Sequence, residues 1–240
     1  MSRLTFWLDR TAYPAHPDNW DNLLFRREVI DRLPAAQNVL DLGAGAGIVR
    51  ELDIRGLAPR VCGIDLDPRV LQNPLLDEAL VGDAEHIPYP DAGFDLVFCN
   101  NVLEHLPDPE RAFSEVARVL RPGGVFLAKT PNRWHYVALL AGLTPHRFHE
   151  AVNAWRGRDR KDTFPTRYRA NSASALRRCA AAAGLVVEHV SFVEGRPEYL
   201  RMTAPTYLLG IAYERIVNAT SLLAPWRVVL IASFRKPGVS

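Results

Sequence analysis

The sequence is poor in lysine and carries little net charge. Three lysines among 240 residues leave arginine to supply nearly all the positive charge, and the formal net charge is only +2. Nucleic-acid-binding proteins usually concentrate basic residues in a patch and have a higher pI than the 8.5 found here. We therefore expect no nucleic-acid partner.

Cysteine is scarce, and long hydrophobic runs are missing. Cys62, Cys99 and Cys179 are far apart and odd in number, which fits neither a disulfide framework nor a CxxC metal site. We expect three reduced, buried thiols in a cytoplasmic protein. No apolar run approaches the ~18 residues that cross a bilayer, and the first residues lack a secretory signal pattern. The sequence thus predicts no transmembrane segment.

Hydrophobic residues make up 48% of the chain, enough for one domain of ordinary size. We expect residues 1–240 to form a single domain organised around residues 38–47, which read Asn-Val-Leu-Asp-Leu-Gly-Ala-Gly-Ala-Gly. Val39, Leu40 and Leu42 predict a buried strand. The alternating glycines after it predict a turn whose bare main chain allows a ligand to approach closely.

The residues after the turn predict a helix over 48–57, because Val49, Leu52 and Leu57 are apolar among polar neighbours. The N-terminus of such a helix would direct free amides at the loop. A dinucleotide-binding fingerprint, G-x-G-x-x-G, requires a glycine where this chain has Ile48, so binding of a pyrophosphate is disfavoured.

Polar residues stand at the ends of the next predicted strands, which cover residues 60–66, 78–81 and 94–99. Ligands of open parallel sheets bind beyond the carboxyl ends of the strands. Asp65, about 20 residues past the glycines, is therefore the predicted ribose ligand, although NAD enzymes use the same acid. Asp67 could share this role or, with Pro68 next, equally start a helix. Asp83 and Asn100 end the later strands and have simpler alternatives, as a turn acid and a strand-ending residue.

Four segments between about residues 38 and 130 resemble, in order, the class I S-adenosylmethionine-dependent methyltransferases. Asp41-x-Gly43-x-Gly45-x-Gly47 is similar to their motif I. Residues 82–97, with Gly-Asp-Ala followed by Ile-Pro-Tyr-Pro-Asp-Ala-Gly-Phe-Asp-Leu-Val, look like the adenine-binding segment of the type 11 methyltransferase family. Asn100 follows a family-like strand, and residues 115–124 (Glu-Val-Ala-Arg-Val-Leu-Arg-Pro-Gly-Gly) end a family-like helix.

The resemblance implies transfer of a methyl group from S-adenosyl-L-methionine to a small molecule. It implies a Rossmann-like α/β fold, with a doubly wound seven-stranded sheet, mostly parallel with one antiparallel strand, and helices on both faces. In the family, the acid at Asp83 accepts from the adenine amino group and the amide at Ala84 donates to the ring. The implied cofactor-binding residues are Asp41, Gly43, Ala44, Gly45, Gly47, Asp65, Leu66, Asp83, Ala84 and Asn100.

The cofactor-binding half is expected to cover residues 36–130, and the chain beyond residue 130 departs from the family. An amphipathic helix over residues 19–33 lies in an N-terminal helical cap, residues 1–35, which either covers the cofactor cleft or packs on the sheet. Residues 131–170 mix aromatic side chains with arginines, which suits a pocket for a planar or anionic acceptor or, equally, a solvated lid. Further expected elements are helices over 109–120 and 171–183 and strands over 125–130, 185–193 and 228–234.

An insert over residues 194–227 is longer than the family usually has, and residues 205–223 within it predict an apolar helix. This helix could cover the pocket, form a dimer surface in a homodimer, or lie at a membrane interface. The acceptor is accordingly expected to be aromatic, anionic or lipid-like. Peripheral membrane contact and the choice between monomer and homodimer stay open.

A methyl group on sulfonium is already electrophilic, so positioning and desolvation matter more than a catalytic triad. A general base would help an oxygen acceptor, and the candidates are His105, His135, His146 and His149. His105 equally fits a residue that holds a loop. His146 and His149 share a helical spacing but have no third ligand nearby, so no metal is predicted. Two rival functions remain: an NAD(P)-dependent Rossmann oxidoreductase and a non-catalytic methyltransferase-like scaffold.

Overall fold

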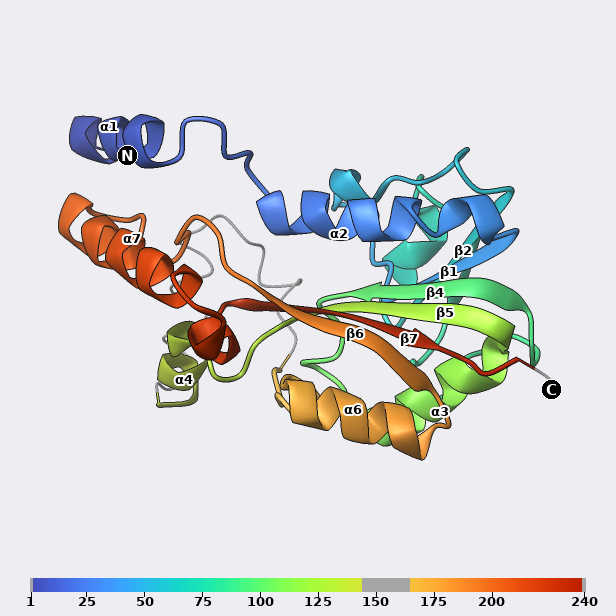
Figure 1. Ribbon diagram of the computed structural model, residues 1–240. Coiled ribbons are helices and arrows are strands. Elements are labelled where there is room, and N and C mark those ends of the chain that lie inside the picture. The colour runs from blue at the N-terminus through green and yellow to red at the C-terminus, as the bar shows by residue number, and fades with distance from the viewer. Residues whose placement is uncertain (1, 144–164, 239–240) are drawn as a thin grey trace. The chain divides into compact units, whose positions relative to one another are not determined.

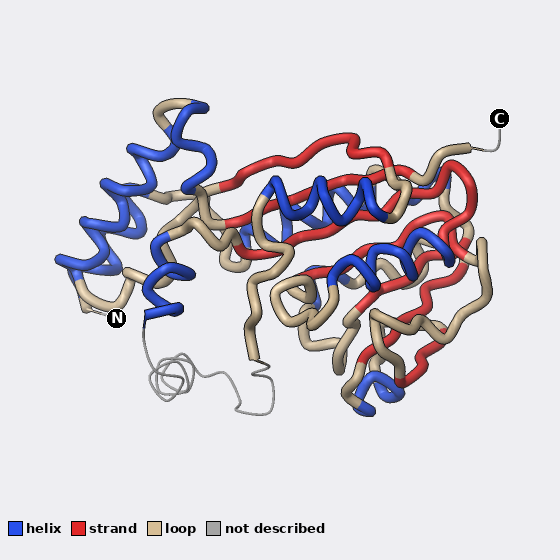
Figure 2. The backbone as a smooth tube through the Cα atoms, turned by 90° about the horizontal axis from the view of Figure 1, so that it is seen from below, coloured by secondary structure: helices blue, strands red, loops and turns tan. Residues whose placement is uncertain are grey.

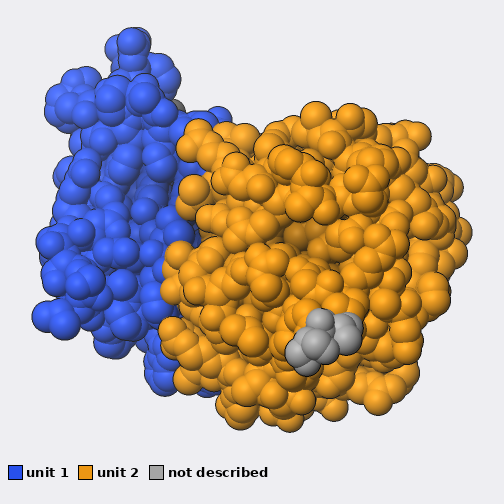
Figure 3. All heavy atoms as spheres, turned by 45° about the vertical axis from the view of Figure 1, so that its right-hand side comes forward, with its two compact units in different colours: residues 1–21, 131–164, 192–229 blue, residues 22–130, 165–191, 230–240 orange. Residues whose placement is uncertain are grey.

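The computed structural model describes residues 2–143 and 165–238 (Figure 1). It divides into two compact units, coloured separately in Figure 3. The sheet unit comprises residues 22–130, 165–191 and 230–240, and the helical unit comprises residues 1–21, 131–164 and 192–229. The segment expected to form an N-terminal cap is divided between them after residue 21.

The sheet has seven strands in the order β3-β2-β1-β4-β5-β7-β6. β1 pairs in parallel with β2 and β4, β2 with β3, and β4 with β5. β7 runs antiparallel to β5, because Gly123 bonds to Lys236 while Asn132, further along β5's direction, bonds to the earlier Val228. This confirms the predicted sheet. The strands are β1 (Asn38–Leu42), β2 (Arg60–Asp65), β3 (Glu78–Val81), β4 (Phe94–Asn100), β5 (Leu120–Pro131), β6 (Val186–Val193) and β7 (Val229–Arg235).

Helices cover both faces of the sheet, as expected (Figures 1 and 2). α2 (Trp20–Ile30) lies on one face, and α3 (Pro109–Val119) and α6 (Ala173–Ala182) lie on the other. α3 begins after Asp108, whose side chain accepts from the amide of Arg111. Its buried Phe113 stands 5.3 Å, centroid to centroid, from both Phe126 and Phe234 in the core between helix and sheet.

The helix expected over residues 48–57 does not form, and this prediction was wrong. Only a 3-10 turn, Arg50–Leu52, is present, and Asp53 ends it in an extended conformation. The Asp53 side chain accepts from the amide of Arg55, and the backbone carbonyl of Asp53 accepts from the guanidinium of Arg26. These bonds compete with the helical ladder, so the glycine loop has no helix N-terminus behind it.

The helical unit contains α1, within the segment expected to form a helical cap, and α7, which corresponds to the predicted apolar helix. It also contains α4, which the sequence did not predict. α7 begins with a capping box formed by Thr203 and Thr206, and its first residues include a proline. Among the residues described, no helix combines the length and the apolar composition needed to cross a bilayer. The bounds are α1 (Arg3–Ala12), α4 (Tyr136–Leu143), α7 (Ala204–Asn218) and a 3-10 helix (Ser221–Trp226).

Candidate cofactor site

A small cavity lies in the sheet unit where the carboxyl ends of β1 and β4 meet. The strand order reverses at this pair, with β2 and β3 on one side and β5 on the other. Doubly wound sheets bind ligands at such a switch point. The cavity is lined by Asp41, Gly43, Ala44, Gly47, Val49, Leu52, Asn73, Leu75 and Asn100, of which Asp41, Gly43, Ala44, Gly47 and Asn100 are predicted cofactor ligands.

The loop after β1 is shaped for glycine. Gly43, Gly45 and Gly47 have φ angles of 80°, 54° and 72°, in the region that side chains rarely adopt. A Cβ on Gly43 would lie 2.3 Å from a methyl carbon of Val102, and one on Gly47 would lie 2.4 Å from Oδ1 of Asn73. The main chain is therefore bare at the cavity, as the motif indicated.

Asp65, at the end of β2, holds this loop in place. Its Oδ2 accepts from the amide of Gly45 at 2.8 Å, and its Oδ1 accepts from the amide of Asp67, also at 2.8 Å. Each carboxylate oxygen has capacity for more than one donor, so both can still accept from a hydroxyl group. Asp65 thus stands beside the loop with an arrangement suited to a ribose diol.

Asn73 is a second support for the loop, and no motif pointed to it. Its Nδ2 donates to the carbonyl oxygens of Ala44 (3.1 Å) and Gly45 (3.2 Å), while its Oδ1 accepts from the amide of Leu75. The side chain is buried, with 7% of the residue exposed. The following Pro74 marks a turn in the sequence, but nothing local indicates contacts with residues 28 and 29 positions earlier.

Asp41 places a titratable group at the cavity. Burial raises the pKa of its carboxyl group to about 8, and the nearby charge of Asp65 raises it further in the same direction. The carboxyl group is therefore mainly protonated at neutral pH. A cation bound in the cavity would favour its ionised form.

Asn100 offers an unused hydrogen-bond acceptor. Its Nδ2 donates to Oδ1 of Asn22 at 3.3 Å, and the same oxygen accepts from the buried ammonium group of Lys129 at 2.5 Å. These bonds fix the amide orientation. Oδ1 of Asn100 is buried and has no hydrogen-bond partner among residues 2–143 and 165–238. Such an atom beside a cavity is suited to an N–H donor of a ligand.

A series of buried side-chain hydrogen bonds near this end of β4 was also not predicted from the sequence. The carboxyl group of Glu104 accepts from the hydroxyl of Thr130 at 3.1 Å, and that hydroxyl accepts from Nδ2 of Asn171 at 2.6 Å. Burial raises the pKa of Glu104, while nearby positive groups oppose the rise. These hydrogen bonds connect the loop after β4, the end of β5 and the residue two before α6.

Leu66, Asp83 and Ala84, like Gly45 and Asp65, are not part of the cavity lining. Oδ1 of Asp83 accepts from the amide of Glu85 at 3.0 Å, and its carbonyl accepts from the amide of His86, which are the contacts of a turn acid. Leu66 is 63% exposed. Binding of a cofactor by Leu66, Asp83 and Ala84, as by the other predicted ligands, stays a prediction.

His105 holds a loop in the sheet unit. Its Nδ1 lies 3.1 Å from the carbonyl oxygen of Pro165, and its Nε2 lies 3.9 Å from Oε1 of Glu104. The first of these contacts matches the alternative in which the residue has a structural role. His146 and His149 lie outside the described residues.

His135 is buried in the helical unit. Its Nδ1 accepts from the amide of Val137 at 3.4 Å, and its Nε2 lies 3.6 Å from Oε2 of Glu194. Burial lowers the pKa of His135 to about 3 and raises that of Glu194 to about 8. Both groups are thus mainly neutral at pH 7, so the pair is not an ion pair.

Comparison with known proteins gives a consistent result. The type 11 family model described as "Methyltransferase domain" matches residues 40–128. A protein described as "Probable S-adenosylmethionine-dependent methyltransferase" from Mycolicibacterium smegmatis (strain ATCC 700084 / mc(2)155) is 42% identical over 123 residues, covering 47% of each chain. A ubiquinone biosynthesis O-methyltransferase from Thiobacillus denitrificans (strain ATCC 25259 / T1) is 36% identical over 122 residues, 47% of this chain and 52% of that one. The chain thus spans about half the length of these curated relatives.

Solved structures share the fold. The geranyl diphosphate C-methyltransferase of Streptomyces coelicolor A3(2) superposes with a TM-score of 0.57 at 17% identity, covering 95% of this chain and 88% of that one. The matched residues 40–128 include the glycine loop, Asp65 and Asn100. Residues 40–128 therefore carry a type 11 methyltransferase domain, which is similar to that of curated S-adenosylmethionine-dependent methyltransferases.

Proposed function

We propose that this chain binds S-adenosyl-L-methionine at the cavity between β1 and β4 and transfers its methyl group to a small-molecule acceptor. The observation that supports this most strongly is the bare main chain of Gly43–Gly47, which is fixed by hydrogen bonds to Asp65 and Asn73. A Cβ at Gly43 would collide with Val102 and one at Gly47 with Asn73, so packing within the protein requires glycine at both positions. A ligand can approach the main chain of such a loop closely.

The residues present fit this cofactor. The two carboxylate oxygens of Asp65 suit the ribose hydroxyls, and Oδ1 of Asn100 suits an N–H of the α-ammonium group. Asp41 would supply a negative charge to a cationic ligand once ionised. When bound, the cofactor supplies a methyl group already made electrophilic by the sulfonium, so the chain must mainly orient the acceptor and exclude water.

The acceptor we propose is aromatic or lipid-like. In the helical unit, Tyr136 packs edge-on to Tyr213 at 4.8 Å and against His135 at 4.1 Å between ring centroids, in the segments after β5 and β6. The relative named for ubiquinone biosynthesis acts, by its name, in making a molecule of that kind. Screening extracts for compounds that gain one methylene mass with the purified chain tests this class directly.

Titration calorimetry separates the proposed activity from its rivals. We expect S-adenosyl-L-methionine to bind and NAD not to bind, because the third glycine of the dinucleotide fingerprint is replaced by Ile48. Binding of NAD without S-adenosyl-L-methionine would contradict the proposal. Binding of S-adenosyl-L-methionine without turnover on any acceptor would favour the non-catalytic scaffold.

Asp65→Ala is expected to weaken binding of S-adenosyl-L-methionine by about 1 to 3 kcal/mol, because the ribose hydroxyls lose a charged acceptor and Gly45 loses the partner of its amide. Asp91→Ala is the control. Its exposed side chain pairs with Arg118, on other segments than the loop. Equal affinities of the two variants would remove Asp65 from the site.

Asn73→Ala is expected to reduce the affinity for S-adenosyl-L-methionine by roughly 2 kcal/mol, about 30-fold, since two loop carbonyls lose their donor. Gln72→Ala, a change at the exposed preceding residue, should leave binding unchanged. Calorimetry on both variants checks this. Wild-type affinity in Asn73→Ala would show that the loop does not depend on this side chain.

A further inference from the structure

α1 is anchored in the helical unit by one face only. Leu8 packs with Ala204 and Tyr207 of α7. Asp9, next to it, forms an ion pair with Arg201, with 3.0 Å between Nε and Oδ2, and accepts from the hydroxyl of Tyr207. Charge-assisted bonds of this kind are strong and directional. The rotation of α1 about its own axis is therefore fixed within this unit.

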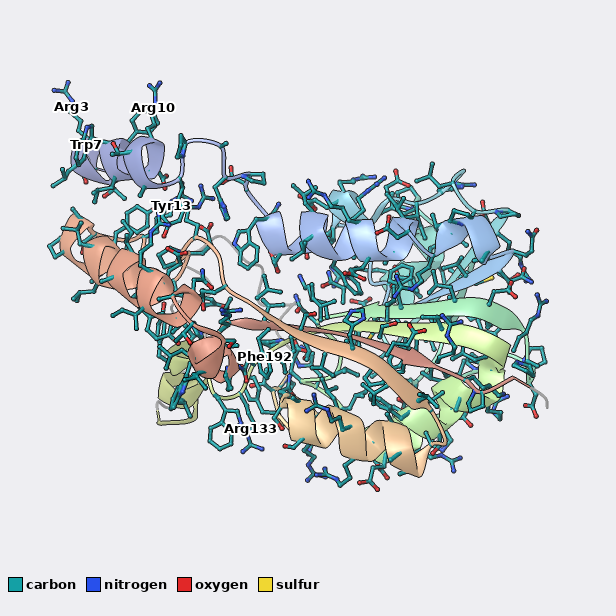
Figure 4. All side chains as sticks on the ribbon, in the orientation of Figure 1. Arg3, Trp7, Arg10, Tyr13, Arg133 and Phe192 are labelled. Carbon is teal, nitrogen blue, oxygen red and sulfur yellow. The ribbon has the colours of Figure 1, made fainter. Side chains whose placement is uncertain are left out.

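The opposite face of α1 presents an alternation of arginine and aromatic side chains. Arg3, Phe6, Trp7 and Arg10 are spaced i, i+3, i+4 and i+7, which places them on one side of a helix. Phe6 is 55% and Trp7 57% exposed, and Leu4 beside them is 53% exposed. Figure 4 shows Arg3 and Arg10 directed to the side of α1 away from α7. We call Arg3, Phe6, Trp7 and Arg10 the arginine-aromatic face.

The positive charge of this face is not neutralised within the part of the chain that the structure describes. Neither Arg3 nor Arg10 forms an ion pair there, and the guanidinium of Arg10 lies 5.8 Å from the ring centroid of Phe6. Asp18 is already paired with Arg196, as Asp9 is with Arg201. The face therefore combines large exposed rings with two positive charges open to an anionic partner.

We propose that the arginine-aromatic face docks on a membrane surface that contains anionic lipids. Aromatic rings with an apolar body settle at the boundary between headgroups and acyl chains, and arginines bind lipid phosphates. A lipid surface needs no complementary shape, which suits a single convex helix with three adjacent exposed apolar side chains. Each arginine near such a surface is expected to increase binding roughly fivefold.

α7, the helix for which the sequence left a membrane interface open, fits this role less well. It exposes Leu208, Leu209 and Ile216, but the guanidinium of its Arg215 pairs with Glu214. The docking face is thus a different helix from the one the sequence suggested. It does not depend on the proposed methyl transfer, because lipid binding is measured without cofactor or acceptor.

Sedimentation of the full chain with vesicles tests the proposal. We expect the chain to sediment with vesicles of phosphatidylcholine mixed with phosphatidylglycerol, to bind far less to phosphatidylcholine alone, and to be released by salt. The double variant R3Q/R10Q should lower binding to the anionic vesicles roughly 25-fold, the product of two fivefold steps. F6S/W7S should also lose most of this binding.

R133Q/W134Q is the matched control. The Arg133 guanidinium lies 5.3 Å from the ring centroid of Trp134, and both residues are exposed. They lie in the same unit, in the turn between β5 and α4. This variant should bind vesicles like the wild type. Circular dichroism should show the same helix content in all variants, because every replaced side chain is exposed.

Three results would overturn the proposal. One is equal binding to neutral and anionic vesicles, and another is an equal loss of binding in R133Q/W134Q. The third is no vesicle binding at all. If F6S/W7S then also converts a dimer to a monomer, the face is assigned to a second copy of the chain.

Discussion

Gly47→Ala is expected to lower the affinity for S-adenosyl-L-methionine by about 100-fold or more. Alanine at a φ of 72° costs about 1 to 2 kcal/mol, and its Cβ would lie 2.4 Å from Oδ1 of Asn73. Crowding of this kind costs about 1 to 3 kcal/mol. Either the loop or the Asn73 side chain must move to relieve the contact, and both movements break the bonds from Asn73 to Ala44 and Gly45. Calorimetric titration measures the effect.

Gly56→Ala is the control for this change, because Gly56 has a φ of 80° but a Cβ there would have nothing within 4 Å. It should cost about 1 to 2 kcal/mol of folding stability and leave the affinity unchanged. A Gly47→Ala variant that loses no more affinity than Gly56→Ala would show that close packing of this loop is not needed for binding.

The affinity for S-adenosyl-L-methionine should rise with pH, by about tenfold per unit, as pH increases from about 6 to 8. Asp41 is the reason: its carboxyl group has a pKa of about 8 and is mainly protonated below that value. A cationic ligand in the cavity favours the ionised form, so binding must release a proton. Calorimetry in buffers of different ionisation enthalpy measures that release.

Asp41→Asn separates this effect from titration of the cofactor itself. The variant cannot release the proton, so its pH profile should be flatter than that of the wild type and its binding enthalpy should depend less on the buffer. Identical profiles and identical proton release in the two proteins would contradict a role of Asp41 in binding.

The same group makes a prediction for folding. The folded-state pKa of Asp41, about 8, lies above its usual value of 3.8, so the folded state holds the proton more tightly than the unfolded state. Its contribution to stability is present at low pH and is lost as pH rises from about 4 to about 8. Asp41→Asn should therefore gain thermal stability relative to the wild type as pH increases through this range.

The sequence could predict the parts of the fold that depend on neighbouring residues. Short runs rich in β-branched residues predicted the strands. Polar residues at the strand ends, such as Asp65 and Asn100, predicted the edge of the sheet at which the cavity lies. The alternating glycines indicated a bare turn, because a positive φ is a local requirement. Parallel pairing then brings the strand ends to one edge.

The rest depends on contacts between distant residues. Lys129 donates to Asn22, 107 positions away in the sequence, and Asn73 donates to Ala44, 29 positions away. No rule based on residue spacing predicts either hydrogen bond. The helix expected over residues 48–57 had the right apolar spacing, yet bonds at Asp53 to a neighbour and to Arg26 override that pattern. Local periodicity alone does not include such competing partners.

The most direct test of the account is a crystal structure of the chain grown with S-adenosyl-L-homocysteine, the product form of the cofactor. We predict the ligand in the cavity between β1 and β4, with its ribose hydroxyls on Asp65, its main contacts to the backbone of Gly43–Gly47, and its amino group on Oδ1 of Asn100. A nucleoside bound elsewhere, with this loop free of ligand, would contradict the account.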